Sequence, residues 1–122
     1  MRRIRDTAVL SAVAVLLAVT VATTPVQAAE GRCLITVKRH TYLKGRCDIN
    51  IQSGGSFTVG VGEQSRSKHF AYVTLDSEPG KASGYWNGTE GDDHAHEALG
   101  SLKRRGACWS NSSAKVCAWQ EK

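Results

Sequence analysis

The sequence lacks the patterns that identify several common classes of enzyme, metal protein and membrane protein. It has no Gly-x-Ser-x-Gly elbow to expose a serine nucleophile, and no two cysteines lie within four residues of each other, as the ligands of a zinc knuckle do. Its longest apolar run is shorter than the roughly 20 residues of a membrane-spanning helix. After that run there is no helical period and no internal repeat, so a helical bundle is not expected.

The N-terminus is typical of a secretory signal. Three arginines precede an apolar stretch, residues 8–22, that contains neither charge nor proline, and Pro25 follows before the small residues that lead to Ala28. We predict that residues 1–28 form a cleaved signal helix and that residues 29–122 form one domain, periplasmic or secreted. A retained membrane anchor is the alternative, which the short apolar stretch disfavours.

All four cysteines lie in the predicted exported domain: Cys33, Cys47, Cys108 and Cys117. An even number of cysteines in a small exported domain is typical of a disulfide framework. A tight turn at residues 112–113 would place Cys108 opposite Cys117, and a hairpin centred on His40 would place Cys33 opposite Cys47. We therefore predict these two pairs, with long-range pairings between the two ends of the domain as the alternative.

Alternation of apolar and polar residues predicts short β-strands along most of the domain. The alternation at residues 49–51 stops at a Ser-Gly-Gly break and resumes at residues 57–61, which indicates a hairpin. Further strands are expected at residues 70–75, 82–86 and 99–103. We expect an all-β fold, a small antiparallel sandwich or barrel stapled by two disulfides.

Charge is distributed unevenly along the chain. Six acids and a single base, Lys81, lie between Asp76 and Glu97, although the whole chain carries a net charge of +5. The basic remainder favours anionic partners such as phosphorylated glycans or lipid headgroups, or else is a solvated surface. The densest basic run, residues 103–105, precedes two tryptophans, but a nucleic-acid partner is not expected for an exported protein.

The segment 90–97 carries the most reactive side chains. In an extended conformation Asp92, His94 and His96 share a face, and such a set can bind zinc or copper. The plainer interpretation is a solvated polar loop, so we expect no cofactor and keep the metal site as an alternative. Glu90 and Glu97 could form a hydrolytic carboxylate pair, but a small stapled β domain offers little depth to desolvate a general acid, and no enzymatic activity is expected.

Two adjacent aromatic residues, Tyr85 and Trp86, precede an Asn-Gly turn. Neighbouring strand residues point to opposite sides, so one ring is expected to face the core and the other solvent. An exposed ring beside Asp92, Asp93 and Glu97 would anchor a protein partner or a sugar ring. The plainer interpretation is that both rings cover the rim of the core.

Several blocks resemble those of an uncharacterised family of small exported proteobacterial proteins. They are residues 84–88, 94–96, 99–100, 106–109 and 117–119. The resemblance covers most of the exported domain and implies no activity. In size, export and β architecture the chain is also similar to periplasmic lysozyme inhibitors, although no segment matches their serine-and-tyrosine loop.

From the sequence we predict a monomeric, non-enzymatic binding domain. It is expected to engage a protein or a cell-envelope glycan through residues 85–97, with contacts from Tyr85, Trp86, Asp92, Asp93 and Glu97. A periplasmic zinc or copper protein and an inhibitor of a lysozyme-like hydrolase are the alternatives. Neither a nucleic-acid partner nor, after signal cleavage, a membrane span is expected.

Overall fold

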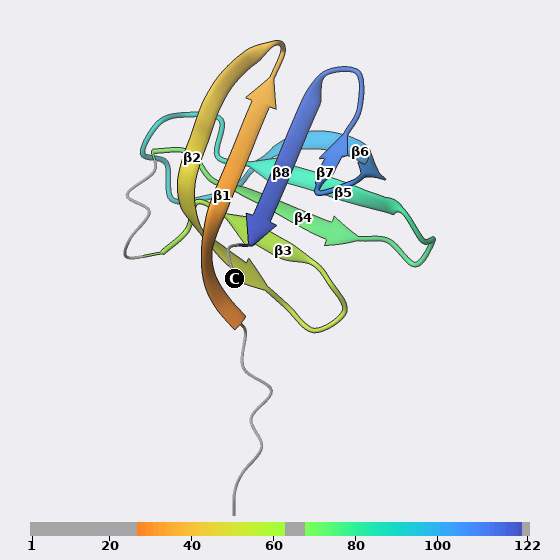
Figure 1. The fold of residues 1–122 in the computed structure, drawn as a ribbon. Coiled ribbons are helices and arrows are strands. Elements are labelled where there is room, and N and C mark those ends of the chain that lie inside the picture. The colour runs from red at the N-terminus through yellow and green to blue at the C-terminus, as the bar shows by residue number, and fades with distance from the viewer. Residues whose placement is uncertain (1–26, 63–67, 121–122) are drawn as a thin grey trace, which may run out of the picture.

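The computed structural model describes residues 27–62 and 68–120, which form a closed antiparallel β-barrel (Figure 1). The predicted all-β fold is confirmed, and of its two forms the barrel is the correct one. The predicted signal peptide lies outside the described residues, apart from positions 27 and 28, which pair in the first strand. The strands of the described part are β1 (Gln27–Val37), β2 (His40–Ile51), β3 (Phe57–Val59), β4 (Ala71–Leu75), β5 (Lys81–Trp86), β6 (Glu97–Arg105), β7 (Cys108–Ser110) and β8 (Ala114–Gln120).

Each strand pairs with the next, and β8 pairs back with β1 to close the wall. Alternation along each strand fills the inside with apolar side chains, because successive residues point to opposite sides of the wall. On β1, Cys33, Ile35 and Val37 are buried, whereas the residues between them are more exposed. The side chains without solvent exposure include Ile35, Ile49, Val59, Leu102 and Val116.

Both predicted disulfides are present. Cys108 and Cys117 are direct cross-strand partners, as predicted from the turn between them. They alternate with core-facing residues, so this bond lies on the outer side of the wall, whereas Cys33 and Cys47 are joined within the core. With sequence separations of 14 and 9, each bond stabilises the fold by about 3 kcal/mol through loop closure.

The β1–β2 hairpin turns at residues 38–39 and not around His40, which corrects the predicted centre. This turn, together with a register shift between Ile35 and Thr36, sets Cys33 opposite Gly45, and the disulfide runs diagonally to Cys47 across the strand pair. Both turn residues have positive φ, 52° and 69°. A two-residue turn with this backbone matches the twist of the strands that it joins, although it favours asparagine and glycine over the lysine and arginine present here.

The up-and-down strand order places alternate connections at the same end of the barrel. One end carries the β1–β2 turn, the end of β3 and the start of β4, the β5–β6 loop and the β7–β8 turn. The amide of Lys38 donates to the carbonyl of Ser113 over 2.7 Å, which ties the first of these turns to the last. The acidic and histidine-bearing residues 87–96 form the β5–β6 loop and therefore lie at this end.

All four cysteines are engaged in disulfides. Such a framework is typical of a protein that folds in an oxidising compartment, outside the cytoplasm. Within residues 27–62 and 68–120, no helix has the length and apolar character needed to cross a membrane.

Candidate functional site

Tyr85 and Trp86, the last two residues of β5, point to opposite sides of the barrel wall. Tyr85 is 41% exposed, whereas Trp86 is 5% exposed and belongs to the core. The prediction that one ring faces the core and the other solvent is confirmed. Trp86 therefore does not display its ring to a partner as we expected, because the ring closes the end of the core and packs edge-on against Tyr42 at 4.7 Å between centroids.

Two histidines extend the aromatic cluster around Trp86. Tyr42 contacts the rings of His40 and His69 edge-on, at centroid distances of 4.5 and 5.0 Å, and His69 stacks on Trp86 at 5.5 Å. Among the described residues, the Nδ1 of His69 is buried without a hydrogen-bond partner. The cluster joins the β1–β2 hairpin to the end of β5, a contact that sequence reasoning missed because its members come from three separate segments.

The side chain of Asn87 determines the shape of the β5–β6 loop. It is fully buried, at 0% exposure. Its Oδ1 accepts a hydrogen bond from the amide of Phe70 at 3.2 Å. Its Nδ2 lies 2.9 to 3.2 Å from the carbonyl oxygens of Lys68, Thr89 and Asp92, to which it donates. Asn87 therefore fastens both halves of the loop to the segment that precedes β4.

An ion pair adds a second attachment between the same segments. Lys68 Nζ lies 2.7 Å from Glu90 Oε1, and both side chains are exposed. The hydrogen bond from Lys68, together with its charge, holds the pKa of Glu90 below its ordinary value. The same contact raises the pKa of Lys68. Glu90 is thus engaged within the chain, whereas Asp93 is exposed and Asp92 is partly exposed, with one carboxylate oxygen near His96.

The loop brings two of the three predicted metal ligands together. His96 Nε2 lies 3.6 Å from Asp92 Oδ2, while Asp93 and His94 are exposed. In the part of the chain that the structure describes, no three His, Cys, Asp or Glu side chains are grouped so as to hold a metal ion. A zinc or copper site at Asp92, His94 and His96 stays a prediction.

Glu97 opens β6 and lies apart from the aspartates. It opposes Trp86 in the β5–β6 pair, and its carboxylate packs directly on Gly88. Glu97 is exposed, but it lies on the same side of the wall as Trp86 and on the side opposite Tyr85. Of the five predicted contact residues, Tyr85, Asp92 and Asp93 are therefore the ones best placed to act together.

Tyr85 has an exposed neighbour that sequence reasoning missed. Tyr72 on β4 is its direct cross-strand partner and is 37% exposed. Phe70 contacts Tyr72 edge-on at a centroid distance of 5.6 Å. Alternation within residues 70–75 placed Tyr72 on one face of a strand, but only the observed register sets it against Tyr85.

Two hollows beside Tyr72 connect this tyrosine pair to the loop. One, of about 300 Å³, is lined in part by Tyr72, Asp92 and Asp93. The other, of about 240 Å³, is lined in part by Tyr72, Tyr85 and Ala95. We call the surface formed by Tyr72, Tyr85, Asp92, Asp93 and Ala95 the tyrosine surface.

Comparison of the chain with protein-family models, curated protein sequences and solved structures finds no match. Neither an activity nor a partner can therefore be transferred from a relative, and the function has to be argued from the geometry and chemistry of the side chains themselves.

Proposed function

We propose that the chain is an exported, non-enzymatic binding domain that engages a protein through the tyrosine surface, and that the partner presents a cationic contact. The observation that carries this proposal is the direct cross-strand pairing of Tyr72 with Tyr85, both substantially exposed, beside the loop that holds Asp92 and Asp93.

Exposed tyrosines on a rigid strand pair are suited to protein recognition. A tyrosine offers a large amphipathic contact area, and fixing its two side-chain torsions costs little conformational entropy. Here β4 and β5 already fix the backbone of both residues, and the contact with Phe70 restricts the ring of Tyr72 further. Preorganised aromatic side chains of this kind are enriched among the residues that dominate binding energy.

Charge supports a cationic partner. Asp92 and Asp93 line a hollow with Tyr72, and Lys68, a base that lines the same hollow, is paired with Glu90. The predicted exported domain, residues 29–122, has 13 bases and 10 acids, a net charge of +3, so much of its surface repels a cationic partner. That repulsion would favour docking at the acidic β5–β6 loop, since complementary charge steers association and sets orientation.

Export to the periplasm or the extracellular space is part of this proposal. It is supported by the signal-like N-terminus and by two disulfides. We propose that the domain acts as a monomer and without a bound cofactor, and that inhibition of a lysozyme-like hydrolase is one specific form that cationic-protein binding could take.

Binding of cationic proteins to the oxidised domain tests the proposal. Lysozyme and cytochrome c serve as cationic probes and ovalbumin as an anionic probe, with calorimetry for affinity and a cell-wall lysis assay for inhibition of lysozyme. Both cationic proteins should bind, and ovalbumin should not. The double variant Tyr72→Ala/Tyr85→Ala should weaken binding at least tenfold, and Asp92→Asn/Asp93→Asn should weaken it and reduce its dependence on salt.

Ser77→Ala supplies the matched control, because Ser77 is an exposed residue between β4 and β5 that lines neither of the two hollows. It should leave affinity unchanged. Equal binding of all three proteins, or cationic binding that is unaffected by loss of both tyrosines, would contradict the proposal.

A further inference from the structure

We propose that the outer side of β1, β2 and β8 binds an anionic polysaccharide, with Trp119 packing on a sugar ring and flanking bases holding its anionic groups. This site is separate from the tyrosine surface and does not depend on the function proposed for it.

The strand registers gather bases and one tryptophan on this side of the wall. On β1, residues 32 and 34 point outward because Cys33 and Ile35 are buried. Arg32 opposes Arg46 on β2 and Trp119 on β8. Leu34 opposes Lys44. The barrel therefore assembles these outward side chains from strands that are distant in sequence.

The same side of the wall continues across β7 to β6. Lys115 and Lys103 both oppose Ser110, one from each neighbouring strand, and Arg105 opposes Cys108. We call the outward bases of these five strands the basic face: Arg32, Lys44, Arg46, Lys103, Arg105 and Lys115.

Acids lie at one margin of the basic face. Glu30 opposes Asp48 in the row beyond Arg32 and Arg46, and a Glu30 carboxylate oxygen lies 3.6 Å from Arg46 Nη2. Because Arg46 is engaged there, Arg32 and Lys44 would make most of the contacts with anionic groups.

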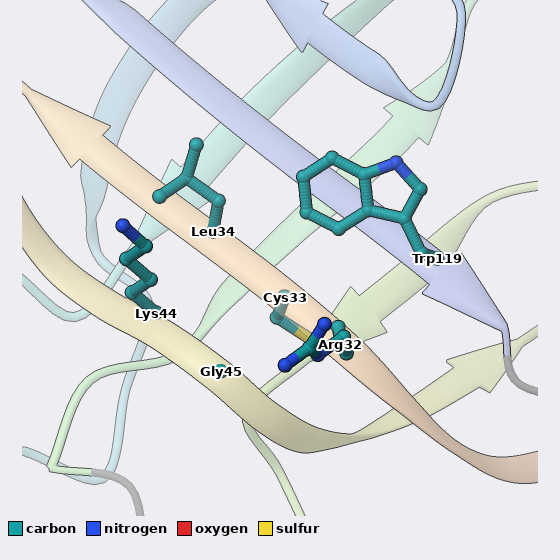
Figure 2. A pocket seen from close by; sticks show the side chains of 6 residues that line it. All are labelled: Arg32, Cys33, Leu34, Lys44, Gly45 and Trp119. Carbon is teal, nitrogen blue, oxygen red and sulfur yellow. The ribbon is translucent and has the colours of Figure 1, made fainter.

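A hollow of about 440 Å³ lies within the basic face. Its lining includes Arg32, Leu34, Lys44 and Trp119, whose side chains stand over neighbouring strands in Figure 2. Trp119 is 42% exposed, so a large part of its ring can be contacted from outside. Leu34 and Trp119 form an apolar part of the lining, and Arg32 and Lys44 supply its positive charge. This combination suits a sugar ring that carries anionic substituents.

The spread of charge favours a polymer over a single small anion. The bases extend over strands spaced about 4.8 Å apart, so a chain with repeated anionic groups could meet several of them at once. A bilayer surface would be favoured by a cluster of protruding apolar side chains, whereas this face has Leu34 and Trp119 among six bases. Anionic glycans of the cell envelope are also the polymers that an exported domain would meet.

Titration of the oxidised domain with a dextran sulfate oligosaccharide tests this proposal, with neutral dextran of the same length as the control ligand. Trp119 reports binding directly, because Trp86 and Trp109 are buried and acrylamide quenching therefore senses chiefly Trp119. We expect dextran sulfate to protect Trp119 from quenching and to bind less tightly as salt rises, and neutral dextran to have at least tenfold lower affinity.

Variants then separate the site from general charge attraction. Calorimetric affinity should fall at least tenfold in Arg32→Gln/Lys44→Gln and in Trp119→Ala, while Trp119→Phe, which keeps a ring, should recover part of the loss. Lys68→Gln removes one exposed base that is paired with Glu90 beside the tyrosine surface, outside the basic face, and it should have no effect. Far-ultraviolet circular dichroism establishes that each variant is folded.

Three outcomes would overturn the proposal. Equal binding of dextran sulfate to the Arg32→Gln/Lys44→Gln variant and to Lys68→Gln would indicate diffuse attraction. Tighter binding of an oligothymidine of equal charge, with stronger protection of Trp119, would assign the face to nucleic acid. Binding of phosphatidylglycerol vesicles without binding of dextran sulfate would assign it to a lipid surface.

Discussion

Arg32 on β1 and Trp119 on β8 are direct cross-strand partners at the seam where the barrel closes. The residues are contributed by the first and last strands, so they meet only when the seam forms. Gly31 lies beside Arg32, and a Cβ at Gly31 would collide with the backbone carbonyl of Trp119. The close approach of the two strands, and with it the basic face, depends on the absence of a side chain at this position.

We therefore expect Gly31→Ala to lower the free energy of unfolding by about 2–3 kcal/mol, as overpacking against a rigid group does. Urea denaturation followed by circular dichroism measures the loss. Gly84→Ala is the comparison variant, because its added Cβ would meet the Leu102 Cδ1 methyl at 2.6 Å and Leu99 Cβ at 3.2 Å, side-chain atoms that can shift more readily than a backbone carbonyl. An equal or larger loss in Gly84→Ala would contradict the role assigned to the seam.

Asn87→Ala should destabilise the domain by about 3 kcal/mol. The substitution removes the acceptor of the Phe70 amide and leaves several carbonyl oxygens without their donor in a buried setting. Amide hydrogen exchange should also accelerate in residues 87–96, which lose their attachment. Asn50→Ala removes one exposed hydrogen bond, to the Val61 carbonyl at 3.0 Å, and should cost less than about 1 kcal/mol. Similar losses in the two variants would refute this account of the loop.

Replacing the β1–β2 turn residues by Asn-Gly should stabilise the domain. Lys38 and Arg39 adopt left-handed backbone conformations that asparagine and glycine adopt at lower cost. The double variant Lys38→Asn/Arg39→Gly should raise the free energy of unfolding by about 1 kcal/mol in urea denaturation. The reversed order, Lys38→Gly/Arg39→Asn, is the control for loss of the two charges and should stabilise less. A fall in stability in the Asn-Gly variant would show that the native turn is supported by contacts of the two bases.

The Lys68–Glu90 pair should make a small pH-dependent contribution to stability. Because the pKa of Glu90 is lowered on folding, its contribution is present above the ordinary glutamate pKa of about 4.3 and is lost as pH falls through the folded value. Carbon-13 NMR titration of the Glu90 carboxyl should give a pKa below that of a free glutamate side chain. Lys68→Gln should raise it toward the ordinary value. An unchanged pKa of Glu90 in Lys68→Gln, or an equal rise in Lys81→Gln, would contradict the claim that Lys68 lowers this pKa.

Much of the fold could be predicted from local patterns. Alternation identified the hairpin around residues 52–56, and the spacing of Cys108 and Cys117 around their turn predicted a direct pairing that the structure contains. The same reasoning found the Cys33–Cys47 bond but misplaced its hairpin, because it assumed that the two cysteines oppose each other, whereas the bond is diagonal and a register shift lies between Ile35 and Thr36. Local sequence thus predicted the pairing of strands and cysteines more accurately than the register of that pairing.

Features that depend on closure of the barrel could not be predicted from local sequence patterns. The pairing of β1 with β8 joins the two ends of the domain, and no local pattern specifies it. Alternation predicted that Tyr85 and Trp86 face opposite sides, but it could not say which ring enters the core. Tyr72 was missed as a site residue because its exposure matters only once the β4–β5 register places it against Tyr85.

The central claim is that the barrel carries two separate binding faces of opposite charge. Nitrogen-15 NMR of the labelled, oxidised domain tests it most directly, with lysozyme and dextran sulfate oligosaccharide titrated in separate samples. Lysozyme should shift amide resonances around Tyr72, Tyr85 and residues 92–95, and dextran sulfate should shift those around Arg32, Lys44 and Trp119. Overlapping sets of shifted resonances, or shifts spread evenly over the barrel with either probe, would contradict the claim.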